Sequence, residues 1–168
     1  MKLSKSLLIL IIALLSLSVA GCKDDEETNY AKDIEGTYKG DFKLGGQLPV
    51  GENVEIKIER KDNSTVTLSL DEILTNVPFG EGGTLPQLPL NVSCECTVLY
   101  SVDPSASTTI TGYAIGGTTK VDLPIPGITE PVETTIGGFI TEEYNATITI
   151  VVNLMGSPVS VVFTGEKE

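Results

Sequence analysis

Residues 54–71 read VEIKIERKDNSTVTLSLD, and this stretch decides the fold class. Apolar and polar residues alternate in two runs, residues 54–59 and residues 66–71. A period of two sends successive side chains to opposite faces of a half-buried β-strand. Asp62 and Asn63 separate the two runs and favour a tight turn. The segment therefore predicts a β-hairpin with one apolar face and one polar face.

The same alternation continues behind residue 33, where no sustained helical period appears. Further strands are predicted over residues 36–44, 92–100, 108–115, 118–123, 133–141, 145–154 and 158–165. Gly116-Gly117 and Gly156-Ser157 lie where hairpin turns are needed, because glycine adopts the backbone angles of tight turns. Residues 76–89 are rich in proline and glycine and are predicted to form a long loop.

Eight or nine short amphipathic strands indicate an all-β fold, an antiparallel meander closed into a barrel. Closure removes the exposed edges of the sheet, whereas the alternative, a β-sandwich, keeps them. The barrel requires the first strand, near Tyr38, to pair with the last strand, near Val161. It also predicts inward side chains at Tyr38, Phe42, Val54, Ile56, Ile58, Val66, Leu68, Leu70, Ile148, Ile150, Val159, Val161 and Phe163. Outward side chains are predicted at Lys39, Lys43, Lys57, Glu59, Thr67 and Thr149.

The first 21 residues are predicted to be a cleaved signal peptide. Lys2 and Lys5 precede an apolar run that suits a signal-peptide core and is short for a membrane-spanning helix. The run ends in VAGC, residues 19–22, which resembles the lipobox of bacterial lipoproteins. This resemblance implies cleavage before Cys22 and a lipid on its thiol. The alternatives are an ordinary signal peptide with a chance cysteine, or a short membrane helix.

An acidic run follows the predicted lipid site directly. Its residues are Lys23, Asp24, Asp25, Glu26 and Glu27, and they resemble the export signal of surface lipoproteins of the Bacteroidota. The resemblance implies an outer-membrane location facing outward, at the cell surface. In physical terms residues 22–32 form a polar tether that holds the domain off the lipid.

Two short motifs resemble the calycin-like domain of Bacteroidota lipoproteins. They are IEGTYKG at residues 34–40 and VVFTG at residues 161–165. The resemblance covers most of residues 33–168 in strand order and implies a lipocalin-like, eight-stranded β-barrel. Lipocalins carry Gly-x-Trp on the first strand, and here Tyr38 replaces the tryptophan. The resemblance therefore implies the fold and no lipocalin ligand.

Composition argues against several classes of function. The formal net charge is −12 and Arg60 is the only arginine, which argues against binding nucleic acid. The chain has no histidine, the usual general base at neutral pH and the commonest transition-metal ligand. No serine, threonine or carboxylate pair stands in a pattern that would activate it. We therefore expect no enzyme, no cofactor and no metal site.

Cys94 and Cys96 are predicted to be reduced core residues. Two positions apart on a strand, they share a face, but their Cα atoms lie roughly 6.5–7 Å apart. That separation is at the limit for a disulfide, and two thiols without histidine do not complete a zinc site.

The predicted loop at residues 76–89 is the candidate binding segment. It carries Val77, Phe79, Leu85 and Leu88, and long loops in compact domains are often functional. Alternatively, these side chains fold back as a lid over one mouth of the barrel. The expected function is a binding or display module that holds a small apolar ligand or presents loops to a glycan or a surface protein. The alternative is a structural subunit of an outer-membrane assembly, and interior volume separates the two.

Overall fold

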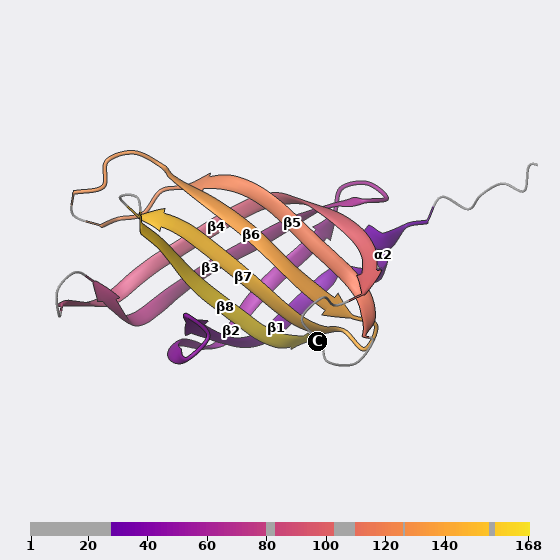
Figure 1. Cartoon of the computed structure of the whole chain (residues 1–168), viewed down its shortest axis with the longest axis horizontal. Helices are drawn as coiled ribbons and strands as arrows, with labels where there is room; N and C mark the ends of the chain where they lie inside the picture. The colour runs from indigo at the N-terminus through magenta and orange to yellow at the C-terminus, as the bar shows by residue number, and fades with distance from the viewer. Residues whose placement is uncertain (1–27, 80–82, 103–109, 126, 155–156) are drawn as a thin grey trace, which may run out of the picture.

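The computed structural model describes residues 28–79, 83–102, 110–125, 127–154 and 157–168. This part of the chain folds into one closed antiparallel barrel, in which each strand pairs with its neighbours in chain order (Figure 1). A short helix, α2 (Tyr30–Ile34), precedes the barrel. The strands are β1 (Gly36–Leu44), β2 (Leu48–Arg60), β3 (Thr65–Phe79), β4 (Gly83–Val102), β5 (Thr111–Val121), β6 (Val132–Thr141), β7 (Asn145–Leu154) and β8 (Ser157–Lys167). The predicted barrel is confirmed, and the sandwich alternative is wrong.

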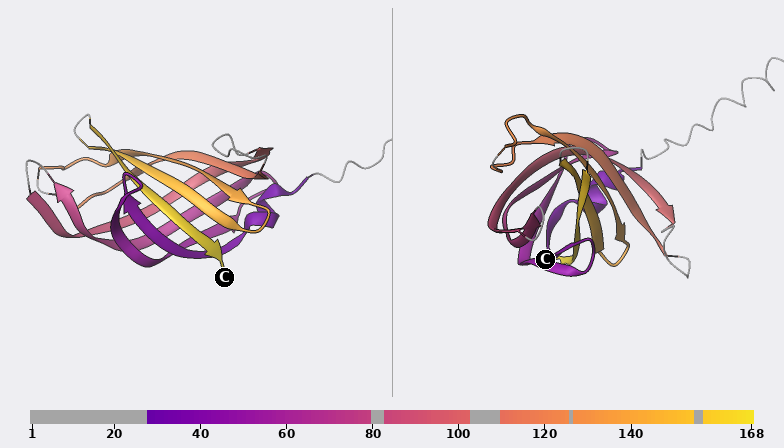
Figure 2. Two further views of the ribbon diagram at one scale, coloured as in Figure 1. Left: turned by 60° about the horizontal axis from the view of Figure 1, so that its bottom comes forward. Right: turned by 60° about the vertical axis from the view of Figure 1, so that its left-hand side comes forward.

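The barrel closes where its first and last strands meet, as predicted. β1 pairs with β8 over seven residues, from Tyr38 opposite Lys167 to Leu44 opposite Val161. Inside this seam, the rings of Phe42 and Phe163 pack edge to face with centroids 5.7 Å apart. The strands run around a common interior in all views (Figure 2).

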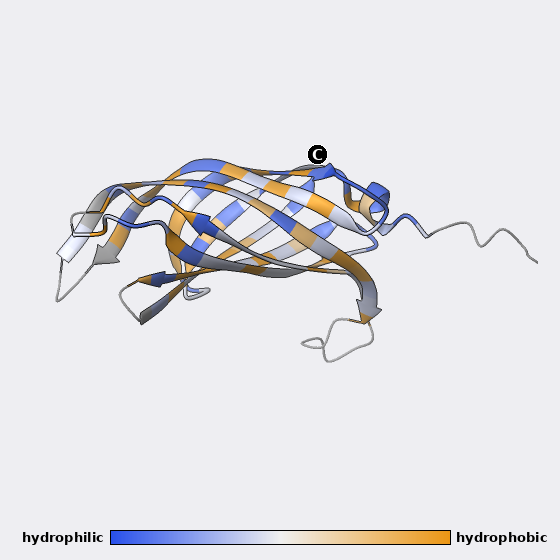
Figure 3. Cartoon of the chain, turned by 90° about the horizontal axis from the view of Figure 1, so that it is seen from above, coloured by the Kyte–Doolittle hydropathy of each residue, from blue (hydrophilic) through white to orange (hydrophobic). Residues whose placement is uncertain are grey.

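Hydrophobic and hydrophilic residues alternate along the strands (Figure 3), and most of the hydrophobic ones are buried. Of the residues predicted to point inward, all are buried except Val159, which is partly buried near the end opposite α2. Ile56, Leu68, Ile148 and Phe163 are essentially inaccessible to solvent. The alternation in the sequence therefore assigned the core correctly, because inward and outward positions on a closed barrel keep a strict period of two.

Helix α2 covers the end of the barrel at which β1 begins. The Asn29 side chain caps the helix by accepting a hydrogen bond from the backbone N–H of Lys32 at 3.1 Å. Ala31 and Ile34 are fully buried, and the Tyr38 hydroxyl donates to the Ile34 carbonyl at 2.9 Å. Residues 30–32, which the sequence placed in the tether, therefore pack against the barrel.

The predicted turn at Gly116-Gly117 is wrong, because β5 continues through both glycines. In place of the two strands predicted around them, residues 108–115 and 118–123, the structure has one strand over Thr111–Val121. Gly117 is required by space, since a Cβ there would collide with the Glu95 carbonyl oxygen and lie 2.9 Å from the Cys94 sulfur. The other predicted turn, Gly156-Ser157, falls partly outside the described residues.

The loop predicted over residues 76–89 is also wrong. Residues 76–79 and 83–89 belong to β3 and β4, which form a long hairpin that reaches the end of the barrel opposite α2 (Figure 1). Its ladder pairs Val77 with Leu85 and Phe79 with Gly83. Prolines are tolerated here because this part of the hairpin has one ladder only. In the described ladders, β4 pairs with β5 from Thr97 onward.

Candidate functional site

The barrel interior is filled by side chains. Its described cavity measures about 40 Å³ and lies near the end opposite α2, between Leu74, Val77, Leu88, Leu123, Ile125 and Leu154. Pockets for small organic ligands usually measure about 300–1,000 Å³. This cavity therefore has room for roughly one or two water molecules. The described interior is a packed core.

The predicted binding residues divide into two groups. Val77 and Leu88 are buried and line this small cavity, which fits the lid alternative rather than exposed display. The side chains of Phe79 and Leu85 lie outside the described part of the structure. Cys22 and the export residues Lys23, Asp24, Asp25, Glu26 and Glu27 also lie outside it.

Cys94 and Cys96 are buried and not joined by a disulfide, as predicted. They lie on β4 opposite Leu68 and Val66 of β3. Burial raises the pKa of Cys94, and it raises the pKa of Cys96 to about 12. Both thiols are therefore protonated at neutral pH, and thiolate chemistry is disfavoured.

A cluster of tyrosines surrounds α2 at its end of the barrel. The ring of Tyr30 stacks on Tyr100 with centroids 6.1 Å apart, and Tyr100 meets Tyr113 edge to face at 5.5 Å. The Tyr113 hydroxyl donates to the Asp33 carboxylate at 3.0 Å. Burial, together with this hydrogen bond, raises the pKa of Tyr113 to about 12. The cluster fastens α2 to the barrel rather than forming a reactive site.

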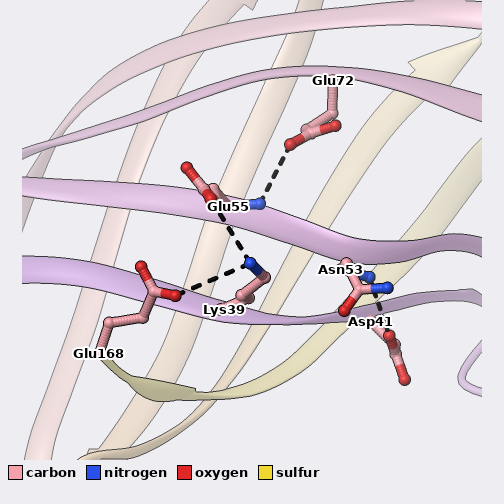
Figure 4. A network of polar contacts seen from close by, with 6 residues as sticks. All are labelled: Lys39, Asp41, Asn53, Glu55, Glu72 and Glu168. Carbon is pink, nitrogen blue, oxygen red and sulfur yellow. Dashed lines mark hydrogen bonds and ion pairs between the residues drawn. The ribbon is translucent and has the colours of Figure 1, made fainter.

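A polar network joins β1, β2 and β3 on the outside of the barrel (Figure 4). Lys39 lies 3.8 Å from both Glu55 and Glu168, and the backbone N–H of Glu55 donates to the Glu72 carboxylate at 3.0 Å. The β2–β3 ladder spans only Lys57–Arg60 and Val66–Ser69. Side chains therefore bridge the two strands beyond that ladder. The network explains how this part of the wall is held together.

A groove of about 570 Å³ lies on the outside of the wall formed by β5, β6 and β7. It is lined by Ala114, Thr135, Gly137, Gly138, Phe139, Thr141, Asn145, Thr147, Thr149 and Val151. None of these side chains is ionisable, although the chain carries a net charge of −12. The groove thus combines hydroxyl and amide groups with a partly exposed aromatic ring.

Two glycines lie opposite each other on neighbouring strands of this wall, and one of them, Gly137, lines the groove. Gly116 of β5 and Gly137 of β6 are paired and both face outward. Beyond its chain neighbours, a Cβ at Gly137 would meet no atom within 4 Å, and one at Gly116 would meet only the Ile136 carbonyl oxygen at 3.8 Å. Neither residue has a positive φ. Packing and backbone geometry therefore do not require glycine at these two positions.

This groove was not predicted from the sequence. Its signal was the glycine pair 137–138 inside a predicted strand, because glycine in a strand often marks the close approach of a ligand or another backbone. The alignment of Thr135, Phe139 and Thr149 across two strands appears only when the register is known.

Within the described residues, no helix is long and apolar enough to span a membrane. Family models, curated proteins and solved structures contain no match to this chain.

Proposed function

We propose that the protein is a non-catalytic binding module, anchored by lipid on Cys22 at the outer-membrane surface, whose outer wall binds a neutral, hydroxyl-rich ligand such as a glycan. We also propose that its domain belongs with the calycin-like domains of Bacteroidota lipoproteins. The closed, eight-stranded antiparallel barrel supports that assignment. The lipobox and the following acidic run support the location.

The space beside Gly137 is the observation that carries the proposal. Glycine inside a strand weakens it, because it loses more conformational freedom on folding and packs no side chain. At Gly137 no steric conflict offsets this cost. A ligand that approaches the backbone closely accounts for the glycine, and its ladder partner is also a glycine, Gly116.

The chemistry of the groove favours a saccharide over a charged ligand. A charged ligand would find no opposite charge among the lining side chains. Hydroxyl groups such as those of Thr147 and Thr149 both donate and accept hydrogen bonds, as sugar hydroxyls do. Phe139 adds an apolar surface for the carbon-bound hydrogens of a sugar ring. The interior, with about 40 Å³, supports placing the ligand outside the barrel.

Binding of neutral and acidic oligosaccharides by the lipidated protein in detergent tests the proposal. Gly137→Val fills the groove, and Thr147→Val removes a hydroxyl from its wall. Thr97→Val is the matched control, because Thr97 is an exposed strand threonine outside the groove. Neutral glycans should bind the wild type and the control, and binding to both groove variants should fall about tenfold or more. Equal binding by all four proteins, or binding by none, would contradict the proposal.

A further inference from the structure

Large exposed apolar side chains gather at the end of the barrel that carries α2. Among the described residues, the exposed large hydrophobic side chains are Leu48, Ile73, Leu99, Tyr100, Val102 and Tyr144. Leu99 is 60% exposed, Val102 49%, Tyr100 46% and Tyr144 40%. These four residues, called here the tether-end patch, lie at the end of β4 and in the β6–β7 turn. Exposed apolar side chains gathered at one end of a domain commonly mark a protein or membrane contact.

The patch is built on ordered structure. Val102 pairs with Thr111 and Tyr100 with Tyr113 in the β4–β5 ladder. The Tyr100 hydroxyl donates to the Glu142 carboxylate, which ties β4 to the β6–β7 turn. Tyr144 in that turn lies under the Lys167 ammonium group, which is 4.6 Å from the ring centroid. The backbone that carries Leu99, Tyr100 and Val102 is therefore held in a ladder, and Tyr100 and Tyr144 each have a side-chain partner.

The chain reaches its predicted lipid anchor from this same end. The described residues begin at Thr28, immediately before α2. At a maximum of about 3.5 Å per residue, the segment from Cys22 to Thr28 spans no more than about 20 Å. An anchor at Cys22 thus keeps this end of the barrel close to the membrane and leaves the opposite end outermost.

We propose that the tether-end patch rests on the lipid surface, with Leu99 and Val102 entering the headgroup region and Tyr100 and Tyr144 at the interface. This inference depends on the proposed anchor at Cys22. Tyrosine is enriched at membrane–water interfaces because its ring is apolar and its hydroxyl is polar. Docking through this end fixes the barrel axis relative to the membrane.

Neighbouring carboxylates are compatible with a neutral lipid surface. Asp33 accepts the Tyr113 hydroxyl, and Glu142 accepts the hydroxyls of Tyr100 and Thr111. Lys167 lies within the same region and reaches the Asp33 carbonyl oxygen. Because the chain as a whole is acidic, the contact should be with zwitterionic rather than anionic lipid.

A single tryptophan provides the test, because the chain contains none. The lipidated full chain, carrying Leu99→Trp, is reconstituted into phosphatidylcholine vesicles that contain brominated phosphatidylcholine. Ile73→Trp is the matched control, because Ile73 is 54% exposed and lies towards the opposite end. Bromine should quench Leu99→Trp about twofold more strongly than Ile73→Trp, and acrylamide should show the reverse order.

Three outcomes separate this inference from the proposed function. If the wild-type protein does not float with the vesicles, the anchor is wrong and both proposals fall. If it floats, but Leu99→Trp and Ile73→Trp respond equally to both quenchers, only the docking proposal is overturned. If Leu99→Trp does not fold, as judged by reactive Cys94 and Cys96 thiols, Tyr144→Trp replaces it as the reporter, with the same expected result.

Discussion

Gly116 on β5 lies directly opposite Gly137 on β6, and both face the outside of the barrel. Their chain neighbours, Gly117 and Gly138, face inward, where a Cβ would collide with backbone. At Gly138, for example, it would lie 2.7 Å from the Thr147 carbonyl oxygen. One pair of glycines is thus needed for the packing of the wall, and the other pair only leaves open space. Alanine substitutions at the two kinds of position should therefore differ in their effect on stability.

We predict that Gly137→Ala and Gly117→Ala change stability in opposite directions. Alanine at Gly137 meets no neighbour, so the free energy of unfolding should rise by about 0.5–1 kcal/mol, because the unfolded chain loses conformational freedom. Alanine at Gly117 meets the Glu95 carbonyl oxygen and should lower the free energy of unfolding by about 1–3 kcal/mol. Urea unfolding of both variants measures this difference. A destabilised Gly137→Ala variant would show that the residue has a packing role.

We predict that Tyr38→Phe lowers the free energy of unfolding by about 1–2 kcal/mol. The Tyr38 side chain is fully buried, and its hydroxyl satisfies the Ile34 carbonyl oxygen of α2. Removing the donor leaves that acceptor without this partner at the mouth of the barrel. Tyr144→Phe is the control, because Tyr144 is 40% exposed, and its unfolding curve should match the wild type. Equal curves for wild type and Tyr38→Phe would contradict the role assigned to this bond.

We predict a loss of stability as the pH rises above about 9, to which Cys96 contributes. The ordinary thiol pKa is 9.0, and burial raises the pKa of Cys96 to about 12. Between these values the unfolded chain has released this proton while the folded chain retains it. The folded state then binds more protons than the unfolded state, so the free energy of unfolding falls as the pH rises through this range. Below pH 9 the thiol is protonated in both states, and its contribution to stability is fully present. Tyr113 acts in the same direction, since its pKa is raised from 10.0 to about 12.

The Cys96→Ala variant isolates the thiol contribution to this pH dependence. At pH 8 the substitution should cost about 1 kcal/mol, because a small buried group is lost. From pH 9 to pH 11 its stability should decline less steeply than that of the wild type. Urea unfolding at intervals of one pH unit gives both curves, and parallel curves would rule out a titrating Cys96.

The barrel could be predicted from sequence because its interior is apolar and its strands are regular. Residues such as Ile56 and Leu68 point inward at every second position of their strands, and closing the sheet into a barrel keeps this alternation. The wrong predictions, a turn and a loop, fell where glycine or proline occurs within a strand. Position 117 requires glycine because the backbone of β4 passes close to it. Pro86 lies in the part of the β3–β4 hairpin that does not pair with β5.

The groove could not be predicted because it depends on alignment between strands. Thr135 and Thr149 are unremarkable outward residues on separate strands, and neither sequence segment shows that they line one surface. Their register places Thr135 opposite Val151 and Thr149 opposite Gly137. The missing side chain at Gly137 then becomes a depression rather than a break in a strand. Which outward residues share one surface of a barrel wall therefore depends on the register between its strands.

We predict that Cys22→Ser abolishes lipid labelling and releases the protein from membranes. The lipobox pattern at residues 19–22 requires the cysteine thiol as the acceptor of the lipid, and serine does not supply it. Cys94→Ala is the matched control, since that cysteine is buried and should have no part in acylation. Metabolic labelling with a fatty acid, followed by membrane fractionation, distinguishes the two variants. Unchanged membrane fractionation of Cys22→Ser would contradict the lipid anchor.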